Sequence, residues 1–507
     1  MVILLLLGHV TALAADWPQY RGPTTDGIST EPINTHWPVN GPTVLWRNST
    51  ATNGFSSPIV SEGRVFAMSL KGNASGGYDE YCVAINTTNG ATLWATAIDA
   101  APANWDPHGI YYGGDGTAPW NTGDGTRTTP SAKDGRVYAA SGSLRLVCLN
   151  ATNGAILWND DLQSSFGGTP PPQYDNCASP CLDDDLIFIN INTATNDETL
   201  LAIRTSDGSK AWSSQNENLT HATPLVTTIQ GVRQVIFATV TGLVSVERNS
   251  GSFLWKFTYP FPPIGTSMGA SPLFYSNTVY CTTAYGRGAA AAQVIFTNNA
   301  WSVTQLYYKH EGPNPPLYYS SIWMSPVCYQ GYVYSLAGNN SGTFLTAPLS
   351  CIELATGALK WSTNNFGMGG LILVNSNLVA VTEKGALVLI QPNPNAYTEL
   401  ARFQAFTFTA STPGKCWNSP SFSDGHLYVR STREVISLDV SVPTPPIIAV
   451  QPRSRAAVVA SSPGFSVVAT NTPGNAYQWR FAVSNTLAGR TNASLTLTNV
   501  QPTNFGD

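Results

Sequence analysis

The sequence is poor in charge: only 11% of its 507 residues are Asp, Glu, Lys or Arg, and the formal net charge is −5. A nucleic-acid-binding domain usually carries a basic patch, and this balance supplies none. Thr, Ser, Asn, Gly and aromatic residues are abundant instead, which suits short strands joined by turns. The composition argues against a nucleic-acid partner and predicts an all-β chain with a large core.

Long apolar runs are also scarce. After the first residues, no segment reaches the roughly 18 apolar residues that a membrane-spanning helix needs. The short N-terminal run Val2–Leu7 leads to Ala12-Leu13-Ala14, which fits an A-x-A cleavage site. Residues 1–15 are therefore interpreted as a signal peptide, without a following cysteine to mark a lipoprotein. We expect an exported protein in the periplasm, on the cell surface or secreted.

Cysteine is too rare for a disulfide scaffold, with eight residues in the whole chain. Cys82, Cys148 and Cys351 occupy equivalent positions of a repeat and are expected to be small buried residues. Cys177 and Cys181 leave two alternatives open, a disulfide or free thiols, and lack the nearby ligands that zinc requires. No G-x-S-x-G motif is present, so a hydrolase is not supported.

What the sequence does contain is a repeat that ends in tryptophan. CLNATNGAILW, residues 148–158, reads as a short strand, a polar turn with glycine and a second strand. The glycine supplies the positive φ that a hairpin turn needs. The tryptophans that close the copies, and that we expect to dock one blade on the next, are Trp94, Trp158, Trp212, Trp255 and Trp361.

A second motif, (S/T)-P followed by alternating apolar residues, marks the start of each unit. Its prolines are Pro58, Pro130, Pro180, Pro224, Pro272, Pro326 and Pro420, with a degenerate start at Gly369-Gly370. Most starts are about 44 to 54 residues apart, the size of a four-stranded propeller blade. The first interval is longer and contains an insertion, Ala100–Arg127.

The last unit, Ser419–Asp439, lacks a fourth strand, and the other end of the chain supplies one. Pro42–Ser49 has the pattern of that strand, with Trp46 at the docking position. Pairing the two removes an open sheet edge. The sequence therefore predicts an eight-bladed β-propeller over residues 16–440, closed by an N-terminal strand.

The pattern changes after the propeller. Residues 441–446, SVPTPP, are a Pro-rich linker. Residues 447–507 alternate like the strands of an immunoglobulin-like sandwich around Trp479, with too few strands for a whole domain. A partial Ig-like domain is predicted.

The repeats resemble the pyrroloquinoline quinone (PQQ) β-propeller repeat, whose docking motif runs approximately A-x-D-x-x-T-G-x-x-x-W. Residues 84–94 and 202–212 match it loosely, with Asn86 and Arg204 in place of Asp. WPQYRGPTTDGIS, residues 17–29, is similar to the N-terminal signature of exported PQQ-like propellers from planctomycete and verrucomicrobial bacteria, and the tail is similar to domains of verrucomicrobial secreted proteins.

The resemblance implies one of two functions. Quinoprotein dehydrogenases of alcohols or sugars bind PQQ and calcium at the centre of the ring. Non-catalytic relatives are scaffolds, such as the propeller lipoprotein of the outer-membrane β-barrel assembly machinery. The adjacent Cys-Cys pair that many of the dehydrogenases place against the quinone is absent from this sequence.

Few residues qualify as ligands or catalysts. The weak candidates for calcium are Asp115 and Asp124 in the insertion, which lacks the spacing of an EF-hand loop. The weak candidates for cofactor binding are His221, Arg287 and Arg430. His108 and Arg21 are further candidates, and a structural, hydrogen-bonded role is the alternative for each. Asp183–Asp185 and Glu383-Lys384 are interpreted as hairpin turns.

The sequence favours an exported, non-catalytic propeller that binds a protein or polysaccharide at the cell envelope, as a monomer. The alternative is a PQQ- and calcium-dependent dehydrogenase of alcohols or sugars. If a site exists, the insertion is expected to form part of it, because long loops on a rigid scaffold often carry function.

Overall fold

The computed structural model describes residues 16–103, 105, 125–171, 174–193, 198–262, 268–312, 317–338, 347–409, 411–443, 447–453, 455–470, 477–481 and 485–502. The chain divides into two compact units, Met1–Ser441 and Val442–Asp507. The expected signal peptide and most of the insertion lie outside the described residues. In the part that is described, no helix is long and apolar enough to cross a membrane.

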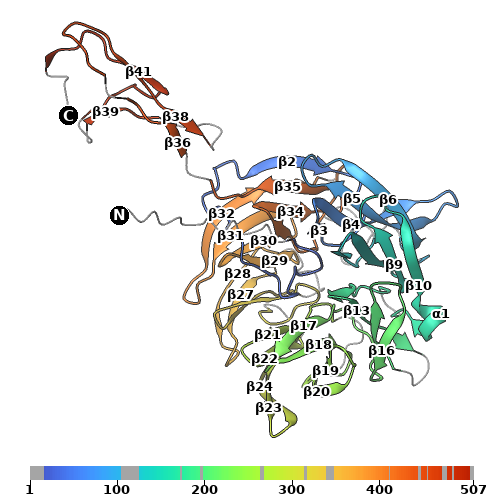
Figure 1. Ribbon diagram of the computed structural model, residues 1–507. Helices are drawn as coiled ribbons and strands as arrows, with labels where there is room; N and C mark the ends of the chain where they lie inside the picture. The colour runs from blue at the N-terminus through green and yellow to red at the C-terminus, as the bar shows by residue number, and fades with distance from the viewer. Residues whose placement is uncertain are drawn as a thin grey trace, which may run out of the picture. The chain divides into compact units, whose positions relative to one another are not determined.

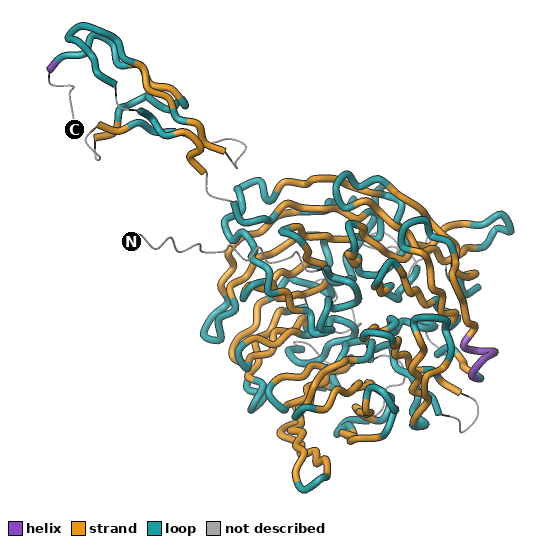
Figure 2. Tube along the Cα trace, in the orientation of Figure 1, coloured by secondary structure: helices purple, strands orange, loops and turns teal. Residues whose placement is uncertain are grey.

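The first unit is an eight-bladed β-propeller, as the sequence predicted (Figures 1 and 2). Blade 1 is β3 (Ile59–Ser61), β4 (Arg64–Gly72), β5 (Tyr78–Asn86) and β6 (Thr92–Ala100); blade 2 is β7 (Ser131–Lys133), β8 (Arg136–Ala140), β9 (Arg145–Asn150) and β10 (Ile156–Asp161). Blade 3 is β12 (Cys181–Asp183), β13 (Leu186–Asn190), β15 (Leu200–Arg204) and β16 (Lys210–Ser214); blade 4 is β17 (Leu225–Ile229), β18 (Val232–Ala238), β19 (Gly242–Glu247) and β20 (Phe253–Thr258).

The second half of the ring repeats this order. Blade 5 is β21 (Leu273–Tyr275), β22 (Thr278–Thr283), β23 (Gly288–Thr297) and β24 (Ala300–Lys309); blade 6 is β25 (Val327–Tyr329), β26 (Tyr332–Leu336), β27 (Leu349–Glu353) and β28 (Leu359–Thr363). Blade 7 is β29 (Gly370–Val374), β30 (Asn377–Val381), β31 (Ala386–Gln391) and β32 (Thr398–Gln404), joined by β1 (Ile28–Ser29); blade 8 is β33 (Ser421–Ser423), β34 (His426–Arg430), β35 (Val435–Asp439) and β2 (Thr43–Asn48). Helix α1 (Leu162–Phe166) and the pair β11 (Gly168–Thr169) and β14 (Asn192–Thr193) lie in connections.

Strand β2 closes the ring. It pairs antiparallel with β35, with Trp46 opposite Ser437, and Figure 1 shows the blue strand beside the orange-red one. The final blade thus takes its outer strand from the N-terminal part of the chain, as predicted.

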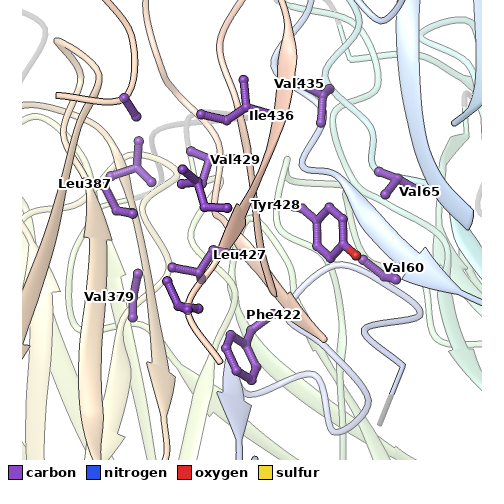
Figure 3. Close-up of a cluster of buried hydrophobic side chains, with 14 of the residues drawn as sticks. Val60, Val65, Val379, Leu387, Phe422, Leu427, Tyr428, Val429, Val435 and Ile436 are labelled. Atoms are coloured by element: carbon purple, nitrogen blue, oxygen red, sulfur yellow. The ribbon is translucent and has the colours of Figure 1, made fainter. Parts of the chain in front are cut away.

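The central strands of each blade read as continuous apolar runs because neighbouring blades cover both of their faces. Blade 8 packs in this way between blades 7 and 1, and Figure 3 shows the cluster. Its members include Val60 and Val65 from blade 1, Val379 and Leu387 from blade 7, and Phe422, Leu427 and Val429 from blade 8. Burying one such side chain contributes about 1.5–3 kcal/mol, so these faces hold adjacent blades together.

Five of the six motif tryptophans donate their indole N–H to the following blade. The indole N–H of Trp94 in blade 1 donates to the carbonyl oxygen of Ala151 in blade 2 at 3.0 Å. A Cβ on Gly154 would lie 2.7 Å from Trp94 Cδ2, so the turn glycine also gives the ring its space. The same indole contact is made by Trp46, Trp158, Trp212 and Trp361, to the carbonyl oxygens of Thr87, Thr205, Arg248 and Asn393.

Trp255 departs from this pattern. Its indole N–H donates to Gln234 Oε1 of its own blade at 2.7 Å. The next blade turns from β23 to β24 through Asn298 and Asn299, both at positive φ, in place of the glycine found in the turns that Trp94 and Trp158 reach.

The second unit is also built of strands: β36 (Ile447–Val450), β37 (Gly464–Ser466), β38 (Val468–Thr470), β39 (Arg480–Phe481), β40 (Asn485–Thr486) and β41 (Ser494–Thr496). They form the pairs β36–β38, β37–β41 and β39–β40. The indole N–H of Trp479 donates to Asn492 O at 2.9 Å, and its ring lies 6.4 Å from Phe465. The immunoglobulin-like assignment of this unit remains a prediction.

Candidate functional site

The N-terminal residues Asp16–Glu31, here called the axial segment, run along the first strands of the blades. Trp17 bridges Val60 in blade 1, and the carbonyl oxygen of Pro18 accepts the N–H of Ala132 in blade 2. Further contacts, in blades 3, 4, 6, 7 and 8, are Gln19 with Leu182, Thr25 with Val226, Arg21 with Pro326, β1 with β29, and Glu31 with Asp424. A segment that touches seven blades lies at the ring axis.

A pocket of about 140 Å³ lies at the same axis. It is lined by Tyr20, Phe55, Ser57, Arg127, Thr129, Tyr174, Cys177, Ser179, His221, Thr223, Gly269, Tyr285, Ile322, Trp323, Gly369, Trp417, Asn418 and Ser419. Most of these residues precede a repeated proline, and two positions recur: the residue directly before the proline, position −1, and the residue three before it, position −3.

Position −1 forms a belt of hydrogen bonds around the axis. Ser57 Oγ accepts the backbone N–H of Ser419 at 3.0 Å, which joins blade 1 to blade 8. The backbone N–H of Ser57 in turn donates to Thr129 Oγ1 in blade 2, also at 3.0 Å. The belt continues from Thr129 to Ser179, from Ser179 to Thr223, and from Ser271 to Ser325. The repeated (S/T)-P motif therefore fastens neighbouring blades at the centre of the ring.

Position −3 builds an aromatic wall on one side of the pocket, from Phe55, Trp323 and Trp417. The ring centroid of Trp417 lies 4.7 Å from that of Trp323 and 5.2 Å from that of Phe55. Blade 5 has Gly269 at this position, and a Cβ there would lie 3.1 Å from Trp323 Cβ. The glycine leaves the space that Trp323 occupies.

Two ionisable side chains, Glu383 and Lys415, contact Trp417 in this wall. The Trp417 indole N–H donates to Glu383 Oε1 at 2.9 Å, and the backbone N–H of Met368 donates to Glu383 Oε2 at 3.1 Å. Lys415 Nζ lies 3.8 Å from the centroid of the Trp417 ring. Burial raises the pKa of Glu383. Glu383 does lie in a turn, as predicted, but its buried carboxyl group also positions an aromatic side chain of the pocket.

The opposite side is polar, because position −3 there holds Arg127, Cys177 and His221. The His221 ring lies edge-on to Tyr174 with centroids 5.9 Å apart. The Arg127 guanidinium lies 4.9 Å from the Trp105 ring centroid, and its Nη1 donates to Tyr174 O at 3.2 Å. The pocket thus has an aromatic half and a polar half.

Two buried polar groups in the aromatic half have no hydrogen-bond partner among the described residues. Both Nδ2 and Oδ1 of Asn418 are unpaired, and the residue is only 4% exposed. The indole nitrogen of Trp323 is buried and unpaired as well. Native proteins satisfy most buried polar groups, so unpaired ones in a pocket indicate a position for a ligand or water.

Of the candidates from sequence, the structure places His221 in the pocket wall. Arg430 is outside the wall; it is fully buried and donates to the carbonyl oxygens of Ser56 at 2.9 Å and Thr52 at 3.4 Å. Burial lowers the pKa of Arg430 to about 9. Arg287 lies in the turn before β23 and does not line the pocket. Asp115, Asp124 and His108 lie outside the described residues.

Three other expectations have clear outcomes. Arg21 is structural: its guanidinium donates to the carbonyl oxygens of Thr25, Asp26 and Pro326. Asp184 and Asp185 form the turn between β12 and β13. No disulfide joins Cys177 and Cys181, and the Cys177 thiol lies 3.5 Å from the carbonyl oxygen of Tyr174, so the disulfide alternative is wrong for this structure.

The described residues that line the pocket do not fit a PQQ–calcium centre. Calcium requires several oxygen ligands with carboxylates among them, and hydroxyl oxidation requires a carboxylate base. The described lining residues include neither Asp nor Glu. In the same described part of the chain, no group of three or more His, Cys, Asp or Glu side chains is placed to hold a metal.

Sequence reasoning missed most of this pocket, although the signal was present. Counted from the repeated proline, position −1 is a conserved hydroxyl within the chain, whereas position −3 varies among Phe, Arg, Cys, His, Gly and Trp. Since the repeat places equivalent positions around one axis, the variable position marks the surface that is free to specialise.

Comparison with known proteins agrees with the fold. Residues 79–316 match the sequence model of a family described as outer membrane protein assembly factor BamB. No curated protein sequence matches the chain. The crystal structure of quinohemoprotein alcohol dehydrogenase from Comamonas testosteroni is similar with a TM-score of 0.54 and 13% identity, covering 86% of this chain and 82% of that one.

Two further structures are similar. The quinohemoprotein alcohol dehydrogenase ADHIIG from Pseudomonas putida HK5 has a TM-score of 0.54 and 12% identity, covering 87% of this chain and 83% of that one. BamB from Moraxella catarrhalis has a TM-score of 0.48 and 12% identity, covering 78% of this chain and 99% of that one. At such identities, the similarity to the two dehydrogenases establishes the propeller fold alone.

Proposed function

We propose that the protein is an exported, non-catalytic propeller that acts as a binding or scaffold module at the cell envelope, and that its axial pocket is a recognition site. The observation that carries this proposal is the composition of the pocket wall, which combines aromatic rings with Arg127, His221 and hydroxyl groups, without a described carboxylate. Such a wall can bind and orient a ligand, but its described residues offer no carboxylate to remove a hydroxyl proton.

The location at the envelope has separate support. The N-terminal residues have the pattern of a signal peptide. The family matched by residues 79–316 is described as an outer membrane protein assembly factor. Fractionation of cells that express the full-length chain tests this part, with recovery in the periplasmic or membrane fraction as the expected result.

The decisive experiment adds PQQ and Ca²⁺ to the purified protein. Quinone binding is followed by absorbance, and turnover by dye-linked oxidation of ethanol and glucose. We expect neither saturable PQQ binding nor dye reduction, while circular dichroism reports an intact β-structure. Saturable binding together with substrate-dependent dye reduction overturns the proposal in favour of a quinoprotein dehydrogenase.

A further inference from the structure

We propose that the axial pocket binds a neutral pyranose unit of a glycan, which stacks on the aromatic wall and forms hydrogen bonds with Asn418. This inference rests on the proposed function, because it names the class of ligand for the same pocket. It is carried by the unpaired polar atoms and by the aromatic rings beside them.

Asn418 determines the hydrogen-bonding character of the ligand. Its amide offers two N–H donors and one carbonyl acceptor, and both ends are buried and unpaired. Exchanging the oxygen and nitrogen positions would leave the same pair of functions. The nearby Trp323 indole adds one more unpaired donor. A complementary ligand must therefore donate and accept at neighbouring atoms.

This requirement separates the classes of ligand. A carboxylate or phosphate dianion only accepts hydrogen bonds and would leave Asn418 Oδ1 unpaired. An ammonium group only donates and would leave the amide N–H groups and the Trp323 N–H unpaired. Adjacent hydroxyl groups, or a hydroxyl beside an acetamido group, both donate and accept. Leaving a buried polar group unpaired costs about 1–3 kcal/mol, so a neutral group is favoured in the aromatic half, whereas Arg127 lines the polar half.

The aromatic wall suits the apolar C–H face of a pyranose, whose hydroxyl groups would bind Asn418. The Trp323 and Trp417 rings are 4.7 Å apart between centroids and tilted by 46°, and Lys415 already covers a face of the buried Trp417. Trp323 is partly exposed, so it is the ring that can offer a π-face with negative electrostatic potential. The C–H groups on one face of a pyranose carry partial positive charge and form a flat apolar surface. Lys415 already lies over Trp417, so a cationic ligand would meet a like charge there.

The size of the pocket agrees with one sugar unit. Its volume of about 140 Å³ is on the order of ten times the space that a single buried water requires. Tyr20 from the axial segment lines the pocket, and its hydroxyl lies 3.1 Å from Ser325 Oγ. The pocket therefore accommodates a terminal or side-branch unit of a glycan.

The test is titration of the purified full chain with glucose, mannose and N-acetylglucosamine, each as the monosaccharide and as a disaccharide, by calorimetry and tryptophan fluorescence. We expect saturable binding of at least one of them. Asn418→Leu keeps the approximate shape of the side chain and should weaken binding about tenfold, since two hydrogen bonds are lost. Trp323→Phe, which removes the indole N–H, should weaken it several-fold.

The matched control is Trp301→Phe, in the β23–β24 hairpin and outside the pocket wall, which should bind as the unmodified protein does. Thermal unfolding verifies that each variant is folded. The inference is overturned if none of these sugars binds the folded protein, if Asn418→Leu binds equally well, or if glucuronic acid binds as tightly as the best neutral sugar. Binding of N-acetyltryptophanamide in place of sugars refutes the glycan ligand but leaves the proposed binding function standing. PQQ-dependent turnover refutes both the glycan ligand and the proposed function.

Discussion

Ser57 and Ser419, 362 positions apart in the sequence, are joined by a hydrogen bond of 3.0 Å from the backbone N–H of Ser419 to the hydroxyl of Ser57. This bond closes the belt of position −1 residues where the last blade meets the first. The β2–β35 pairing at the outer edge of blade 8 and the buried packing in Figure 3 also join the two ends of the ring, so closure depends on three separate sets of contacts.

Ser57→Ala is therefore expected to destabilise the propeller. The variant leaves the buried N–H of Ser419 without its acceptor, which should lower the free energy of unfolding by about 1–3 kcal/mol. Urea unfolding followed by tryptophan fluorescence measures the change. Ser75→Ala, at an exposed turn position, should stay within about 0.5 kcal/mol of the unmodified protein. Equal effects at the two sites would contradict a structural role for the belt.

A pair of glycines tests the close packing at a tryptophan-docking turn. Gly154 and Gly135 both have φ of +72°, but a Cβ on Gly154 would lie 2.6 Å from Thr96 Oγ1 and 2.7 Å from Trp94 Cδ2, whereas one on Gly135 would meet nothing within 4 Å. Both alanine variants share the cost of the left-handed backbone, about 1–2 kcal/mol. Gly154→Ala should lose a further 1–3 kcal/mol or so because the Trp94 indole and the Thr96 hydroxyl must move. Denaturant unfolding of both proteins measures the difference, and equal losses in the two variants would show that the packing of Trp94 and Thr96 against this turn is dispensable.

Glu80 should make stability depend on pH. Burial raises its pKa to about 8, and Oε1 accepts the N–H of Gly142 at 2.7 Å while Oε2 is unpaired. Between its ordinary pKa near 4.5 and about 8, the folded protein holds a proton that the unfolded chain has released. Stability should therefore fall as pH rises through this window.

Glu80→Gln removes that proton equilibrium and keeps an acceptor for Gly142. The variant should show a shallower decrease in melting temperature from pH 5 to pH 8 than the unmodified protein. The melting temperature of the variant should still decrease somewhat with pH, because burial also raises the pKa of Glu383. If the melting temperature of the variant decreased with pH as steeply as that of the unmodified protein, Glu80 would not be the main source of the pH dependence.

Thiol labelling tests the environment of the pocket. None of the eight cysteines, all of which lie in the described part of the chain, forms a disulfide, and Cys177 is the one that is not buried. Iodoacetamide should therefore modify the native protein at Cys177 first, as mass spectrometry of peptides can show. Cys177→Ser should abolish the fast label, and a ligand in the pocket should slow it. Fast labelling of a buried cysteine such as Cys181 would argue against the described packing.

The sequence alone determined the architecture, because almost every blade carries the same local sequence motifs. The (S/T)-P start, the glycine turn and the closing tryptophan set strand order and blade size, and the spare strand at Pro42–Ser49 revealed how the ring closes. These are local signals with a fixed period, so they could be read without coordinates.

The pocket depended on tertiary structure. Phe55, Trp323 and Trp417 are scattered over more than two thirds of the chain, and only closure of the ring brings them to one axis. Burial cannot be read from the isolated residues either: Arg430 resembled a ligand-binding arginine but braces backbone carbonyls, and Asn418, which no motif singled out, is left with unpaired polar atoms. The repeat encodes the scaffold locally, whereas the site is defined by long-range proximity.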